Sequence, residues 1–237
     1  MNSDFPLFNI ESFPYITQIR LRNFCGEEFG GRICLNIENI KPQQQKGPTC
    51  GLVALSMCLE HFGVSVSVDE ILEKAKRKGY TKQGEMYSAD SLADLTNEFF
   101  PKSAVVREHF DVKSFSESIC NGRLFLMAYD CGPNYQPVQV KGISAHWLLA
   151  CGFVESSEDC GLIESRSPVE DSENLAIIGY QGKSKTLDVF PFSEVLASNA
   201  QLLEVGPKRD PDEYIIPDPD NLSEIRNRFV EIGINIC

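Results

Sequence analysis

The sequence predicts an α+β fold, because helix-like and strand-like patterns occupy different halves of the chain. In the first half, apolar residues recur every three or four positions from Leu52 to Phe62, which is the period of a helix with one buried face. The second half carries short apolar runs bounded by Gly, Pro and Asp, such as "RLFLMAYD" and "LAIIGYQ", which are typical of strands. Together these patterns predict helices packed on an antiparallel sheet.

Helix-start signals locate the expected helices of the first half. One helix begins at Cys50, with Thr49 as its N-cap. The next, "SVDEILEKAKRKG", carries a capping box formed by Ser67 and Glu70. Further helices are expected from Ser88 and within "SFSESICNG". Strands of the second half are expected at residues 123–130, 144–154, 175–181 and 185–192.

The two ends of the chain are expected to form additions to a central domain. Residues 16–37 alternate apolar and polar side chains around a Gly-rich segment, which predicts a β-hairpin. Near the other end, apolar residues at helical spacing from Leu222 to Ile232 predict a final helix that docks on the domain. The predicted division is an N-terminal hairpin extension at 1–40, a main domain at 41–217 and a C-terminal docking helix at 218–237.

Composition narrows the classes of function. The formal net charge of −12 argues against nucleic acid and anionic membrane as general partners, because both require a basic surface. No run approaches the roughly 18 apolar residues of a membrane span, and the first residues lack the pattern of a secretory signal. Nine scattered cysteines without a CxxC pair suit reduced thiols, so a cytoplasmic protein is expected. With three histidines and no Cys/His cluster, neither a metal nor another cofactor is predicted.

Cys50 is the candidate nucleophile. A cysteine in the first turn of a helix lies at the positive end of the helix dipole, where a thiolate is favoured. Gln44 precedes it across a turn at Gly47 and Pro48, and its amide could donate a hydrogen bond to an oxyanion together with the Cys50 N–H. The neighbouring glutamines of the triplet, Gln43 and Gln45, compete for this role.

A thiol nucleophile needs a base, and three histidines are available. His61 lies about 16 Å along the same helix and cannot reach the sulfur. Nothing in the sequence around His109 directs its side chain, whereas His146 opens an apolar strand directly after a Gly/Ser loop, so His146 is favoured. The group that orients the imidazole stays open among Gln181, Asp188 and Asn199.

Six segments taken in order resemble the actin maturation protease family over residues 40 to 217. They are "QKGPTCGLVALSM", "GEMYS", "AYDCGPN", "SAHWLLACGF", "YQGKSK" and "SNAQLLEVGPKRDPDEYIIP". The resemblance implies a papain-like fold of the C39-like peptidases and removal of the acetylated N-terminal Met or Cys from new actin. It also implies Cys50 as nucleophile, His146 as base and Gln44 as oxyanion donor, with Gln181 where C39-like peptidases carry Asp.

The resemblance also bears on partners. It implies actin as substrate, and Lys46, Lys183 and Lys185 are candidates for meeting its acidic residues. "GEMYS" is a candidate wall for the residue removed. Some family members carry a proline-rich N-terminal segment suited to profilin, and residues 1–40 contain none, so profilin lacks support here. The alternatives are a catalytically silent actin-binding or chaperone-like module and a C39-like peptidase with a different substrate.

Overall fold

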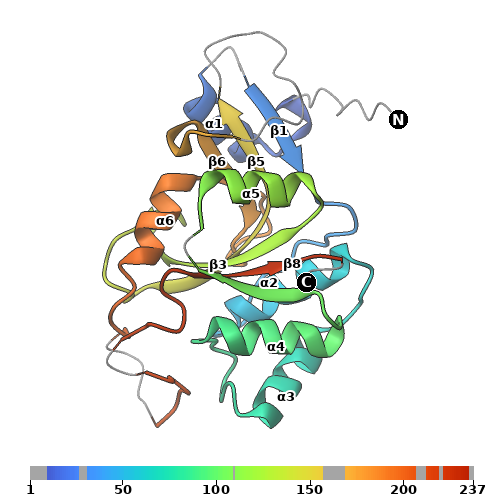
Figure 1. Ribbon diagram of the computed structural model, residues 1–237, viewed down its shortest axis with the longest axis vertical. Coiled ribbons are helices and arrows are strands. Elements are labelled where there is room, and N and C mark those ends of the chain that lie inside the picture. The colour runs from blue at the N-terminus through green and yellow to red at the C-terminus, as the bar shows by residue number, and fades with distance from the viewer. Residues whose placement is uncertain are drawn as a thin grey trace.

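The computed structural model describes residues 10–26, 31–108, 110–156, 169–206, 212–218 and 221–234 (Figure 1). Its helices are α1 Tyr15–Cys25, α2 Cys50–His61, α3 Val68–Lys78, α4 Ala89–Phe99, α5 Val112–Cys120 and α6 Phe192–Ala200. Its strands are β1 Gly31–Leu35, β2 Ala104–Glu108, β3 Leu124–Cys131, β4 Pro137–Val138, β5 Ala145–Ser156, β6 Leu175–Tyr180, β7 Asp188–Pro191 and β8 Arg228–Ile232. Short 3-10 turns cover Ile10–Ser12 and Ser172–Asn174.

The strands form one antiparallel sheet in the order β2-β8-β3-β5-β6-β7. β4 pairs with β3 near its end, and β1 pairs with the far half of β5. Because β5 is the longest strand, it joins the part of the sheet formed by β3 and β8 to the part formed by β6 and β7. This arrangement confirms the predicted α+β class, with helices packed on an antiparallel sheet.

The sheet is buried on both faces. Alternate residues of β3 point to opposite sides, so Leu126 and Ala128 pack in the apolar cluster that includes α2, α3 and α4. Met127 and Tyr129 instead pack in the cluster that includes α5 and α6. Figure 1 shows α2, α3 and α4 on one side of β3 and β8, with α5 and α6 on the other. Burial on both faces explains why β3 is a continuous apolar run without alternation.

The predicted N-terminal hairpin is wrong. Residues 15–25 form helix α1, and β1 pairs with β5. The buried residues of α1, Thr17 and Leu21, are four positions apart, which places them on one helical face. Thr17 donates a hydrogen bond to Leu187 O, and Arg20 forms an ion pair with Asp188, so the helix is held against the start of β7. These distant contacts outweigh the strand-like alternation of the segment.

The predicted C-terminal docking helix is also wrong. Residues 222–226 form only a turn, and β8 follows it as a strand between β2 and β3. Phe229 packs on the face of the sheet covered by α5, whereas Val230 and Ile232 pack on the face covered by α2. β8 is a strand because it pairs with β2 on one side and β3 on the other, and the spacing of apolar residues in the sequence does not reveal these partners.

The other helices and strands that the sequence predicts are present in the structure. Ser67 and Glu70 form the capping box of α3, and Gly79 ends that helix in the left-handed conformation. Ser88 caps α4, and α5, β3, β5, β6 and β7 occupy the predicted segments. Thr49 is the N-cap residue of α2, but its hydroxyl donates to Lys46 O at 3.0 Å and makes no capping hydrogen bond.

Candidate active site

Cys50 is the first residue of α2 and is half-buried, whereas the next nine residues are buried. The first hydrogen bond of the helix runs from Val53 N to Thr49 O at 2.9 Å, so the N–H of Cys50 precedes the bonded ladder. Gly51 allows the helix start to approach the sheet, because a Cβ there would lie 3.0 Å from Trp147 Cδ1 and 3.3 Å from Met86. The thiol is therefore held at the positive helix end, close to β5.

His146, the second residue of β5, supplies a buried imidazole. It pairs with Tyr129 of β3, whose ring packs edge-on against it at 5.9 Å between centroids. His146 Nε2 is hydrogen-bonded to the main-chain oxygen of Gln181, and because a carbonyl only accepts, Nε2 carries the hydrogen. The pKa of His146 is lowered to about 3, mainly by burial and then by the charge of Lys183, while the hydrogen bond to Gln181 opposes both. The imidazole is therefore neutral near pH 7, and Nδ1 is a proton acceptor.

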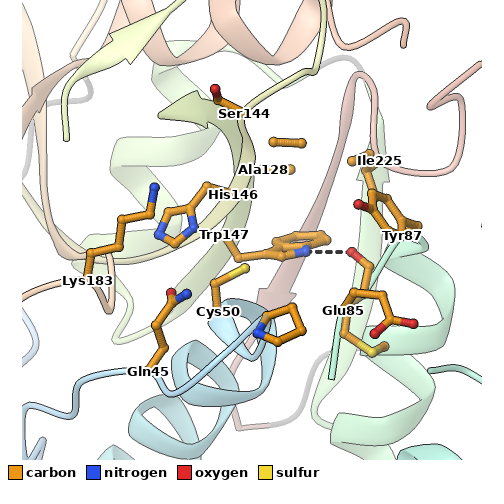
Figure 2. A pocket seen from close by; sticks show the side chains of 13 residues that line it. Gln45, Cys50, Glu85, Tyr87, Ala128, Ser144, His146, Trp147, Lys183 and Ile225 are labelled. Atoms are coloured by element: carbon orange, nitrogen blue, oxygen red, sulfur yellow. Dashed lines mark hydrogen bonds between the residues drawn. The ribbon is translucent and has the colours of Figure 1, made fainter. Parts of the chain in front are cut away.

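A cavity of about 180 Å³ joins these two groups. It is lined by the α2 start, residues 85–87 and 144–147, with Gln45, Lys183, Ala128 and Ile225. Figure 2 shows the Cys50 sulfur between the His146 imidazole on one side and the Trp147 indole on the other. The cavity therefore presents a thiol and a neutral base to the same small volume.

The structure separates the glutamines of the triplet. Gln44, the residue predicted as oxyanion donor, has an exposed side chain whose Nε2 donates to Lys183 O at 2.9 Å, and it does not line the cavity. Gln45 lines the cavity beside Cys50, and its Nε2 uses one hydrogen on Gly47 O at 2.9 Å. Gln43 donates to Ser56 Oγ at 3.0 Å and does not line the cavity. The geometry therefore favours Gln45 over the predicted Gln44.

Of the three candidates for orienting His146, only Gln181 contacts it, through its main chain. The Gln181 side chain accepts from Lys183 N at 2.6 Å and donates to Ser184 Oγ at 3.2 Å, which fixes the turn after β6. Asp188 forms its ion pair with Arg20. The imidazole is therefore oriented by a neutral main-chain oxygen and not by a carboxylate.

Asn199, the third candidate, is occupied elsewhere. Its Nδ2 donates to Ala128 O and Ile225 O, both at 2.9 Å, and its Oδ1 accepts from Asn227 N at 2.6 Å. These bonds tie α6 to β3 and to the turn before β8. Asn199 of the "SNAQLLE" motif therefore has a structural role.

Asp130, at the end of β3, is a positioning residue that the sequence analysis did not assign. It is fully buried, and its carboxylate accepts hydrogen bonds from the main-chain nitrogens of Val140, Gly142 and Ser144 at 2.7 to 3.1 Å. Gln201 Nε2 donates to the same carboxylate at 2.7 Å. These bonds fix the loop that leads directly into His146. An Asp ending an apolar strand before a Gly-rich loop was the available signal.

Residues 85–87, in the "GEMYS" motif, form the opposite wall of the cavity. Met86 O accepts a hydrogen bond from Trp147 Nε1 at 2.8 Å, which joins this wall to the strand that carries His146. Glu85 is buried, and its carboxylate accepts from Lys82 N at 3.1 Å, Gln83 N at 3.0 Å and Ile215 N at 3.2 Å. The wall is thus fixed by main-chain contacts to two separate segments.

The remaining candidate residues are two histidines and three lysines. His61 ends α2, and its Nδ1 is hydrogen-bonded to Glu38 O at 2.9 Å. His109 lies outside the described residues. Lys46 and Lys185 are exposed and do not line the cavity, whereas Lys183 does.

Within the described ranges, no group of three or more His, Cys, Asp or Glu side chains could hold a metal ion, and no helix is long and apolar enough to cross a membrane.

The α+β architecture, with a cysteine at a helix start that faces a histidine on an antiparallel sheet, is that of the predicted papain-like fold. A family model described as the C-terminal domain of actin maturation protease-like proteins matches residues 40–154. The resemblance predicted from the motifs is confirmed: the chain is similar in sequence to the actin maturation protease family.

Curated relatives and a solved structure give the extent of the similarity. Proteins named actin maturation protease are 35% identical over 178 residues in Drosophila melanogaster and 32% identical over 208 residues in Mus musculus. Both matches cover 73% of this chain, which spans 60% and 56% of the two relatives. A candidate C39-like peptidase from Bacillus anthracis superimposes with a TM-score of 0.49 at 10% identity, over 86% of this chain and 98% of that chain.

Proposed function

We propose that this protein is a cysteine peptidase that removes the acetylated N-terminal Met or Cys from immature actin. The observation that carries the proposal is the pairing of Cys50 with a neutral, buried His146 across one cavity. The names of the relatives, actin maturation protease, support the substrate. A cytoplasmic location remains part of the proposal, and profilin remains without support from residues 1–40.

In the proposed reaction, His146 Nδ1 takes the proton of the Cys50 thiol. The resulting thiolate attacks the main-chain carbonyl carbon that joins the acetylated residue to the next residue. The oxyanion accepts hydrogen bonds from the Cys50 N–H and from the second amide hydrogen of Gln45. The imidazolium then gives its proton to the leaving amine, the C–N bond breaks, and a thioester forms on Cys50. Water, deprotonated by His146, hydrolyses the thioester and regenerates the thiol.

The main-chain oxygen of Gln181 has two roles in this scheme. It fixes the tautomer, which leaves Nδ1 as the ring nitrogen able to accept the thiol proton, and it stabilises the imidazolium through the hydrogen bond to Nε2. A catalytically silent actin-binding module would need neither a buried neutral imidazole nor an amide beside the thiol. The cavity therefore favours the enzyme over the silent module.

The proposal is tested by mass spectrometry of actin N-termini after incubation with the protein. The wild type should shorten acetylated immature actin by one residue. Cys50→Ala, which removes the sulfur and adds no bulk at the helix start, should leave actin unchanged while its circular dichroism spectrum matches that of the wild type. Equal processing by both proteins would refute the thiol mechanism, and no processing by the wild type would refute the substrate.

A further inference from the structure

Lys183 is the lysine that lines the cavity, and its main chain is held by two hydrogen bonds. Its main-chain N–H donates to Gln181 Oε1 at 2.6 Å, and its main-chain oxygen accepts from Gln44 Nε2 at 2.9 Å. The side chain is half-buried and lies beside the His146 imidazole in Figure 2. Two glutamine side chains therefore fix the main chain from which the Lys183 side chain extends toward the base.

Among the described residues Lys183 forms no ion pair with a carboxylate, although the whole chain has 34 acidic and 22 basic residues. The carboxylate that lines the cavity, Glu85, accepts hydrogen bonds from three main-chain nitrogens in the opposite wall. The two ends of the cavity therefore differ in charge, with the cation on the side of His146.

A positive charge beside His146 disfavours the proposed reaction unless a nearby anion neutralises it. The charge of Lys183 lowers the pKa of His146, so it disfavours the imidazolium that must form when the thiol is deprotonated. A carboxylate of the bound substrate beside Lys183 would neutralise the charge and remove this penalty. A suitable anionic substrate would thus both bind better and react faster.

The direction of the reaction decides which substrate residue meets Lys183. The imidazolium protonates the leaving amine, so the residue on the C-terminal side of the scissile bond lies next to His146 and therefore next to Lys183. The acyl part then lies toward the apolar wall formed by Met86, Tyr87 and Trp147. We propose that Lys183 selects substrates with an acidic side chain at the first residue of the released product. This inference rests on the proposed function and adds a specificity-determining residue to it.

The test compares two acetylated peptides that differ only in Asp or Asn directly after the N-terminal Met. The wild type should prefer the Asp peptide by about tenfold in kcat/KM, with effects on both kcat and KM. Lys183→Met, which keeps the length and removes the charge, should lose most of this preference, whereas Lys183→Arg should retain it. Lys185→Met, at an exposed lysine two positions away that does not line the cavity, is the matched control and should behave as wild type.

A second readout separates the charge of Lys183 from a merely structural role. Because Lys183 lowers the pKa of His146, its removal should raise that pKa and move the acid limb of the kcat/KM profile to higher pH. Equal cleavage of both peptides by the wild type, or an unchanged preference in Lys183→Met, would overturn the inference alone. Failure of the wild type to cleave either peptide would overturn the proposed function and the inference with it.

Discussion

At the scale of single residues, His146 shows how burial prepares a base. Its imidazole lies between Tyr129 and the turn at Gln181, and the low dielectric of this position disfavours the charged form. The base is therefore in the right protonation state before substrate binds. The same burial destabilises the imidazolium intermediate, and the hydrogen bond to the Gln181 main-chain oxygen partly offsets this effect.

The same burial couples the pH to stability. Between pH 6.5 and about 3 the unfolded chain binds a proton at His146 and the folded protein does not, so this group makes the free energy of unfolding fall as the pH is lowered. The contribution is about 1.4 kcal/mol per pH unit within that window. In urea unfolding from pH 6.5 to 4, His146→Gln should therefore lose less stability than the wild type. Parallel curves for the two proteins would contradict the buried neutral imidazole.

The glutamine triplet yields a prediction that separates neighbouring residues. Gln45→Ala should lower kcat by about 10²-fold with little change in KM, because an oxyanion donor acts mainly in the transition state. Gln44→Ala, whose side chain bonds Lys183 O outside the cavity, should have a much smaller effect. Steady-state kinetics with an acetylated peptide measures both. The reverse ranking would restore the assignment made from the sequence.

At the scale of elements, local signals predicted those elements whose structure is decided locally. The capping residues of α3 and α4 and the start of α2 at Cys50 follow from side chains within a few positions. Helix α1 and strand β8 were predicted wrongly because their structure depends on distant partners, β7 for the former and β2 and β3 for the latter. A short apolar pattern is compatible with both the helical and the strand period, and the tertiary contacts of the segment decide between them.

The start of α2 depends on the absence of a side chain at Gly51. Gly51→Ala gains up to about 1 kcal/mol of helix propensity. It also places a Cβ 3.0 Å from Trp147 Cδ1, and such overpacking costs about 1–3 kcal/mol. We expect a net loss of stability in thermal unfolding. Activity should fall by up to about 10²-fold, because the displaced helix start carries Cys50. A variant as stable and active as the wild type would show that the contact is not tight.

At the scale of the whole molecule, the cavity exists only when distant segments of the chain meet. It combines the α2 start, the 85–87 wall, the β3 and β5 strands, the turn after β6 and Ile225. The sequence could nominate Cys50 and His146, because each has a distinctive local context. It could not choose Gln45, or identify Asp130 and the main-chain oxygen of Gln181, because those roles depend on which groups the folded loops bring together.

The central claim is that Cys50, activated by His146, forms a covalent intermediate, and trapping that intermediate tests it most directly. The protein would be mixed with an acetylated N-terminal peptide of immature actin, quenched in acid within milliseconds to seconds, and analysed by intact-mass spectrometry and peptide mapping. We expect a thioester of the acetylated residue on Cys50 in the wild type, and none in Cys50→Ala or His146→Ala. Product formation without any adduct on Cys50, continuing in Cys50→Ala, would contradict the account.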